Sequence, residues 1–315
     1  MPQQERVEAD LEVLDQIQQR ILWLATYMVE VANNQRPDTD GVKVGGHQAS
    51  CASMVTLMTA LYLHHLDADD FVAVKPHGSP VLHAINHLMG TLDPAYLTTL
   101  RELGGLQAYP SRTKDPDRVD FSTGSVGLGP AATIFAAGVR EYVEAHFGER
   151  YNSRFIAVLG DAELVEANVW EAVHDPASNA MGAVTWLIDF NRQSLDRVVP
   201  DVRISPWQAA FAAHGWQVIQ VKYGSKLRRF AAENDGQALL EWIDEMPNER
   251  YQSLFGLAPA ERRQRFLEGA PESVYALLHD LPDEEVAELV TDLGGHDLPS
   301  VLEALRQADA AVDRP

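Results

Sequence analysis

The sequence of 315 residues contains a single cysteine, Cys51, so an internal disulfide bond is excluded. A lone thiol in an apolar stretch is typical of a reducing environment, and we expect Cys51 to be an inert core residue. The sequence also lacks a run of eighteen apolar residues, and its polar N-terminus has no apolar signal-peptide core. We therefore expect a cytoplasmic protein that does not associate with a membrane.

Basic residues are scarce, with 25 lysines and arginines against 46 aspartates and glutamates, and the formal net charge is −21. A chain of this charge repels phosphate backbones, so nucleic-acid binding is disfavoured. An anionic ligand would have to be held by local features such as a metal ion, a helix N-terminus or a few basic side chains. The 46% of apolar residues can bury a full core, in one large domain or two ordinary ones.

Hydrophobic periodicity gives a coarse view of the fold. Apolar residues recur at three- and four-residue steps over residues 11–31, which predicts an amphipathic helix, and a second apolar helix is expected over residues 50–65. Short apolar, β-branched or aromatic runs separated by helical segments predict strands, and these runs lie within residues 70–80, 154–161, 183–191 and 216–223. This alternation predicts an α/β fold, a doubly wound parallel sheet with helices on both faces. We expect one domain over residues 1–315, with an α/β core at about 10–223 and a helical extension at about 224–315.

Polar residues stand where two of the predicted strands end. Asp161 and Glu163 follow one strand and Asn191 closes the next. The carboxyl ends of neighbouring parallel strands form the edge at which ligands bind in such sheets. Carboxylate and carboxamide oxygens suit Mg²⁺, and a helix starting near Ala162 would direct N–H groups at an anion. The residues indicate a Mg²⁺-diphosphate site, although Asp161 and Glu163 could instead simply cap a helix.

Several segments of the sequence resemble motifs of one enzyme family. The pattern "GDAE", with "NRQ" beginning thirty residues after Asp161, resembles the thiamine diphosphate motif, usually written GDG followed by an asparagine. Further segments resemble, in the same order, parts of transketolase and of the homodimeric-type pyruvate dehydrogenase decarboxylating component: "VGGHQASCASM", "PHGSPVLHAINHLMG", "LQAYPSR", "STGSVGLGPAATIFAA" and the C-terminal "PNERYQSLF … LGGHDLPSVLEAL". The resemblance covers about residues 10–310.

This resemblance implies a thiamine diphosphate-binding fold and a set of roles. Asp161, Asn191 and the main-chain carbonyl of Gln193 would ligate Mg²⁺. His47, His77 and Tyr109 would face the thiazolium ring and the substrate. The residues implied to bind the cofactor are Gly124, Val126, Gly127, Leu128, Gly129, Gly160, Asp161, Ala162, Glu163, Asn191 and Gln193. Among them Gly160 and the backbone after it would receive the diphosphate, while Glu163 would orient the loop.

Two departures from the family pattern stand out. Ala162 replaces the second glycine of GDG, so the turn must avoid positive φ there or accept about 1 kcal/mol of strain or more. Lys75 and Pro76 replace the usual "QG" ahead of the histidine. Lys75, Arg112 and Lys114 are either solvated surface residues or basic groups near the mouth of the site that attract a phosphorylated sugar or an anionic carrier.

The family also needs a glutamate that activates the cofactor, which comes from a separate pyrimidine-binding domain, usually across a subunit interface. No such domain follows in this sequence. The resemblance therefore implies a second subunit that carries the pyrimidine-binding and C-terminal domains, in an α₂β₂-like heterotetramer.

The favoured interpretation is the cofactor-binding subunit of a two-component thiamine diphosphate enzyme. It would form a two-carbon unit, hydroxyacetyl (glycolyl) or acetyl, from a ketose phosphate or a 2-oxo acid. A lipoyl group or carrier-protein thiol would accept this unit, as in split enzymes of antibiotic biosynthesis that the layout resembles. The alternatives are half of a conventional pyruvate dehydrogenase or transketolase, and a non-catalytic regulatory or scaffold paralogue. A nucleotide-binding Rossmann protein is disfavoured, because no clean G-x-G-x-x-G follows a first strand.

Overall fold

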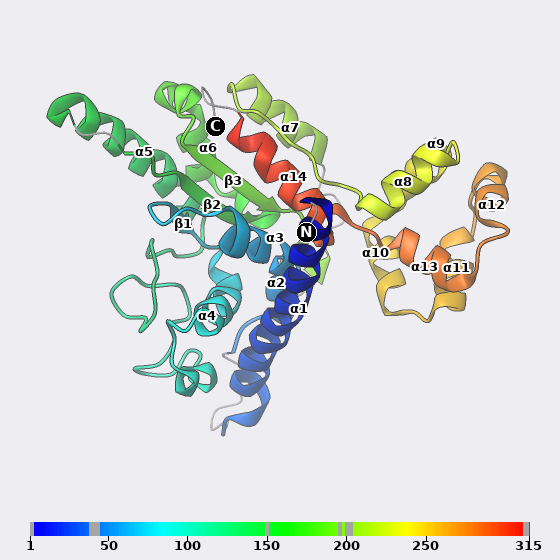
Figure 1. Ribbon diagram of the computed structural model, residues 1–315, viewed down its shortest axis with the longest axis horizontal. Helices are drawn as coiled ribbons and strands as arrows, with labels where there is room; N and C mark the ends of the chain where they lie inside the picture. The colour runs from blue at the N-terminus through cyan, green and yellow to red at the C-terminus, as the bar shows by residue number, and fades with distance from the viewer. Residues whose placement is uncertain (1–2, 38–44, 149–150, 195–196, 199–203, 311–314) are drawn as a thin grey trace.

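The computed structural model describes residues 3–37, 45–148, 151–194, 197–198, 204–310 and 315 (Figure 1). The strands are β1 (Phe71–Ala73), β2 (Phe155–Gly160), β3 (Val184–Asp189), β4 (Gln193–Ser194) and β5 (Arg197–Val198). The first three form a parallel sheet with β2 in the middle, and β4 and β5 form a short antiparallel hairpin. Gly160 at the end of β2 is in register with Asp189 at the end of β3, so the carboxyl ends of these two strands lie level.

Helices make up most of the remaining described chain. They are α1 (Gln3–Glu30), α2 (Gln48–Ala52), α3 (Val55–Ala60), α4 (Ser79–Leu88), α5 (Leu128–Phe147), α6 (Ala167–His174), α7 (Ile204–Ala213), α8 (Ser225–Glu233), α9 (Gln237–Glu245), α10 (Asn248–Ser253), α11 (Pro259–Leu267), α12 (Glu272–Leu278), α13 (Asp283–Val290) and α14 (Leu298–Asp309). The helix expected over residues 50–65 is divided among α2, α3 and a π-helical turn, η2 (Leu61–His65). Among the described helices, none combines the length and apolar character needed to cross a bilayer.

The central strand β2 shows why the sheet is covered on both sides. Each of its residues is buried, and successive side chains point to opposite faces. Ile156 and Val158 belong to a core with residues of α1, α3 and α4. Ala157 and Leu159 belong to a second core with residues of α5, α6 and α7. The prediction of an α/β fold with helices on both faces of a parallel sheet is confirmed.

One predicted strand is wrong. Residues 217–222 form no strand, and Tyr223 makes only an isolated bridge to Leu293. The backbone of this segment bonds elsewhere: Gln217 N–H donates to the carbonyl of Pro315, and Gly294 N–H donates to that of Lys222. Within the described residues β3 is therefore the last strand of the parallel sheet, and four of its six residues are only half-buried.

The described residues after Gly224 are mainly helical, and their helices pack in two different places. Helices α8 to α13 enclose a separate apolar core and lie to one side of the sheet (Figure 1). Helix α14 returns to the body, where Leu298, Val301 and Leu305 pack with Leu14 of α1 and Ala60 of α3. The C-terminal helix thus packs against the first helix of the chain.

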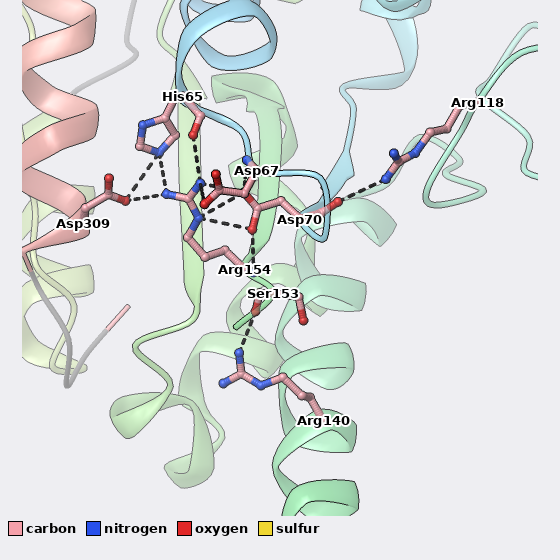
Figure 2. A network of polar contacts seen from close by, with 8 residues as sticks. All are labelled: His65, Asp67, Asp70, Arg118, Arg140, Ser153, Arg154 and Asp309. Carbon is pink, nitrogen blue, oxygen red and sulfur yellow. Dashed lines mark hydrogen bonds and ion pairs between the residues drawn. The ribbon is translucent and has the colours of Figure 1, made fainter. Parts of the chain in front are cut away.

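An ionic network joins the amino ends of β1 and β2 to the end of α14 (Figure 2). Arg154, just before β2, donates to the buried carboxylate of Asp70, with Nη2 2.6 Å from Oδ2. The same guanidinium donates to Asp309 of α14 at 2.6 Å and to the main-chain carbonyl of His65 at 2.9 Å. Arg154 therefore holds three segments together at the edge of the sheet opposite its carboxyl ends.

Candidate functional site

Asp161 follows β2 directly and is the first residue of the 3₁₀ turn η5 (Asp161–Val165). Its side chain is almost fully buried. Its Oδ1 accepts the N–H of Ala162 at 2.8 Å, and its Oδ2 accepts the N–H of Arg192 at 2.7 Å. The bond from Arg192 places the segment after β3 next to Asp161, so the residues that follow β2 and β3 are in contact. Arg192 takes a positive φ of 57° in making this turn.

The carboxamide of Asn191 is oriented by groups from other elements. Its Nδ2 donates to Ser53 Oγ at 3.1 Å and lies 3.4 Å from Asp189 Oδ2. Its main-chain carbonyl accepts from Gln252 of α10 at 3.1 Å. Because the amide nitrogen is directed at Ser53 and Asp189, the amide oxygen points away from these two residues. Gln193 lies in β4, and its side chain is outside the described part of the structure.

Lys75 and Asp189 form a buried ion pair at the same edge. The two side chains are 9% and 7% exposed, and Nζ lies 2.8 Å from Oδ2. Ser53 Oγ donates to the same carboxylate oxygen at 2.6 Å. Of the two alternatives for residue 75, the solvated surface lysine is wrong, because the side chain is buried against Asp189. Arg112 and Lys114 are exposed.

Further groups from the helical extension reach this edge. The guanidinium of Arg192 donates to the side chain of Asn248 at the start of α10. Burial lowers the pKa of His296 of η8 (Gly294–His296), and the negative charge of Asp189 opposes this shift only in part. Sequence reasoning missed Ser53, Asp189, Asn248, Gln252 and His296. Only the resemblance of "PNERYQSLF … LGGHD" to the family's C-terminal stretch pointed toward the last three.

The carboxyl groups of Asp161 and Glu163 lie in an environment that disfavours their ionised forms. Burial and the nearby charge of Asp189 raise the pKa of Asp161 to about 6, although two backbone N–H groups favour its ionised form. Burial likewise raises the pKa of Glu163. Glu163 Oε2 accepts the N–H of Gly160 at 2.9 Å, while the buried Oε1 has no hydrogen-bond partner. A carboxylate oxygen buried without a partner is costly, so this edge favours a bound cation or donor.

Ala162 fits the turn without strain. It lies inside η5 and is not among the described residues with positive φ, so the first of the two alternatives for this position is the one observed. Positive φ occurs instead in the glycine-rich loop before α5, at Val126 (68°) and Gly127 (70°).

The glycine-rich loop packs closely on the sheet and on α6. A Cβ on Gly127 would lie 2.3 Å from Cγ2 of Val169, and one on Gly129 would lie 3.4 Å from the Cβ of Ala73. The main chain of Gly127 opposes only in part the upward shift that burial gives the pKa of Glu163. Near Gly124, Val126 and Leu128 are about half exposed and frame the open side of the loop.

His47, His77 and Tyr109 lie close together. The ring centroids of His47 and His77 are 5.6 Å apart, and those of His77 and Tyr109 are 5.8 Å apart. Arg101, with a positive φ of 62°, joins the two histidines around a narrow recess. Burial, together with the positive charges of His47, Arg101 and Lys75, lowers the pKa of His77 to about 4. His77 is therefore neutral at pH 7, and its buried Nδ1 has no hydrogen-bond partner.

The thiol of Cys51 lies beneath this group and is 3.6 Å from the carbonyl of His77, to which it donates. Burial raises the pKa of this thiol to about 12, so Cys51 is the inert core residue that its context predicts.

The donor set fits a hard divalent cation with a diphosphate. The ends of β2 and β3 bring together three polar groups. They are the carboxylate of Asp161, whose pKa is raised, the carboxamide of Asn191, whose nitrogen is directed at Asp189, and the carboxylate of Asp189. Oxygen ligands of these kinds suit Mg²⁺, which binds through one or two protein groups plus phosphate oxygens. Oε1 of Glu163 and Nδ1 of His77 are two further polar atoms that are buried without a hydrogen-bond partner.

Comparison with known proteins places this geometry in a family. Residues 15–236 match the family described as "Transketolase, thiamine diphosphate binding domain". The chain is 32% identical over 303 residues to the pyruvate dehydrogenase E1 component of Mycolicibacterium smegmatis, covering 91% of this chain and 32% of that protein. It is 29% identical to the same component of Escherichia coli K12, covering 98% and 35%. The chain thus spans about a third of the length of the curated relatives that it matches.

Solved structures give the same fold. Transketolase from Leishmania mexicana superposes with a TM-score of 0.64 at 18% identity, covering 96% of this chain and 35% of that one. A transketolase mutant from Pichia stipitis gives a TM-score of 0.61 at 16% identity, with the same coverage. Together with the match over residues 15–236, these findings show that the chain belongs to the transketolase thiamine diphosphate-binding domain family.

Proposed function

We propose that this chain is the cofactor-binding half of a two-component thiamine diphosphate enzyme. The observation that carries the proposal is the hydrogen bond from Arg192 N–H to Asp161 Oδ2, which joins the ends of β2 and β3 at the positions of the family motif. Asp161, Asn191 and the carbonyl of Gln193 would hold Mg²⁺. The backbone after Gly160 and the loop from Gly124 to Gly129 would hold the diphosphate.

When bound, thiamine diphosphate would supply a nucleophilic thiazolium carbon for reaction with the carbonyl group of a donor. The residues of this chain would position that donor. His77, kept neutral by its surroundings, can accept or donate a proton at its ring nitrogens, and His47 and Tyr109 lie beside it. The proposed donors are a ketose phosphate or a 2-oxo acid, and the proposed acceptor of the two-carbon unit is a lipoyl or carrier-protein thiol.

A second subunit would complete the enzyme. The relatives are about three times as long as the matched region. We propose that a partner in an α₂β₂-like heterotetramer provides the pyrimidine-binding and C-terminal domains, with the glutamate that activates the cofactor. Reconstitution with this partner, followed by assays of ketose phosphates and 2-oxo acids with lipoyl and carrier-protein acceptors, would identify the reaction. Full turnover by this chain alone would overturn the two-component arrangement.

Calorimetric titration of the chain with thiamine diphosphate, with and without Mg²⁺, tests the cofactor site. Mg²⁺-dependent binding should be lost in Asp161→Ala and in Asn191→Ala. Asp280→Ala is the matched control, because its side chain is 97% exposed on the helical extension. Equal binding by all three variants would place the cofactor elsewhere.

A further inference from the structure

The ion pair between Lys75 and Asp189 brings a positive charge to the carboxyl edge of the sheet. Lys75 follows β1 and Asp189 ends β3, so the pair spans the end of the central strand β2. The Lys75 side chain lies across Gly160: a Cβ at residue 160 would be 3.2 Å from Cε and 3.5 Å from Nζ. The ammonium group therefore stands over the residue that is proposed to receive the diphosphate.

Asp189 does not need Lys75 as its only donor. Its Oδ2 also accepts from Ser53 at 2.6 Å and faces the amide nitrogen of Asn191 at 3.4 Å. An ammonium group has three donor hydrogens, and Asp189 accounts for one of them. The carboxylate holds the lysine in place while leaving it able to donate to a second acceptor.

Charge around this edge is otherwise unfavourable for an anion. Asp161, Glu163 and Asp189 are acidic, and Lys75 is the basic group whose charge offsets those of Asp161 and Glu163. A diphosphate brings several more negative charges. Mg²⁺ would neutralise part of this charge, and a fixed ammonium beside Gly160 would neutralise a further part at short range.

We propose that Lys75, positioned by Asp189, is a direct ligand of the diphosphate, so that a protein cation acts there alongside the metal. This inference rests on the proposed function, since it assumes that the diphosphate binds at Gly160. It assigns Lys75 a role in holding the cofactor, which differs from both alternatives that the sequence left open for this residue.

Calorimetry with two probes, thiamine diphosphate and inorganic pyrophosphate, at constant saturating Mg²⁺ tests the proposal. Lys75→Met should raise the Kd for both probes by roughly 10- to 100-fold, the range expected for one charged hydrogen bond. Lys114→Met removes the same charge from an exposed position and should change Kd by less than twofold. Thermal unfolding followed by circular dichroism checks that each variant is folded.

The double variant Lys75→Met/Asp189→Asn separates a ligand from a counter-ion. It removes both members of the pair, restores the formal charge of the wild-type site and leaves no buried carboxylate unpaired at residue 189. If Lys75 binds the diphosphate, the double variant stays weak for both probes. Wild-type affinity in the double variant would overturn the proposal, because Lys75 would then only neutralise Asp189.

The remaining outcomes are also distinct. A loss for thiamine diphosphate but not for pyrophosphate would place Lys75 against another part of the cofactor and overturn its assignment to the diphosphate. Wild-type binding with no effect of Lys75→Met would overturn this inference and leave the proposed function standing. Absence of wild-type binding to both probes, with the chain alone and again with the partner subunit present, would overturn both together.

Discussion

Replacing Arg154 with methionine should destabilise the fold at a point remote from the cofactor site. The substitution keeps much of the aliphatic stem of the side chain and removes the guanidinium group, which contacts Asp70, Asp309 and the carbonyl of His65 (Figure 2). The Asp70 side chain is 1% exposed, so its charge would remain buried without a cationic partner.

The expected loss in the free energy of unfolding at pH 7 is about 3 kcal/mol. Breaking a buried ion pair by removing one partner costs about 3–5 kcal/mol. The lower end applies because Asp70 keeps two backbone donors, the N–H groups of Asp67 and residue 154. The bond to Asp309, which is 44% exposed, adds at most about 1 kcal/mol.

Urea unfolding followed by circular dichroism would measure this loss. Arg118→Met is the matched control, because Arg118 pairs with Asp120 but is 61% exposed and should contribute less than about 1 kcal/mol. Equal losses in the two variants would refute the reasoning that burial of the whole ion pair decides the cost.

The pH dependence gives a second check. The hydrogen bonds and charge of Arg154 hold the pKa of Asp70 below its ordinary value of 3.8 against the effect of burial. The wild-type pair therefore contributes stability that is present above pH 3.8 and is lost as the pH falls through the lower folded pKa. In Arg154→Met, burial acts without the guanidinium and raises that pKa. The difference between variant and wild type should then shrink as the pH falls from 7 toward 4.

Two other predictions concern the site itself. Gly127→Ala and Gly148→Ala both force alanine to a φ near 70°, at a cost of about 1–2 kcal/mol, but only the first places a Cβ 2.3 Å from Val169. Gly127→Ala should thus be more destabilising by a further 1–3 kcal/mol or so in urea unfolding, and equal losses would contradict the packing argument. The His77 ring, followed by NMR, should titrate near pH 4 and not near 6.5, and Arg101→Met should move the midpoint upward. The pKa of His77 is lower in the folded than in the unfolded state, so His77 reduces the stability of the folded state as the pH falls from 6.5 to 4. An unchanged midpoint in Arg101→Met would exclude Arg101 as a cause of the lowered pKa.

Local patterns predicted the strands that carry the site because a buried parallel strand is marked by its own composition. The run over residues 154–159 is apolar at each position after Arg154, and it forms the fully buried strand β2. Residues 216–223 have a similar composition but form no strand, since composition does not specify which backbone groups will pair.

The partners of the predicted site residues could not be read from spacing. Lys75 and Asp189 are 114 positions apart, and Gln252 contacts Asn191 across 61 positions. Each of these contacts depends on how the sheet, the loop after β3 and helix α10 come together. Spacing alone therefore left open whether Lys75 is a solvated surface residue or a basic group near the site.

Helix α10 contacts the loop after β3 through Gln252 and Asn248, and this has a thermodynamic consequence. Any ligand that favours the observed arrangement of Asn191 and Arg192 must, by linkage, also favour the docked state of α10 by the same free energy. Occupancy at the edge of the sheet should therefore slow protease cleavage and amide hydrogen exchange within α10. Protection of α10 would then indicate whether a ligand is bound at the edge of the sheet, although α10 lies far from that edge in the sequence.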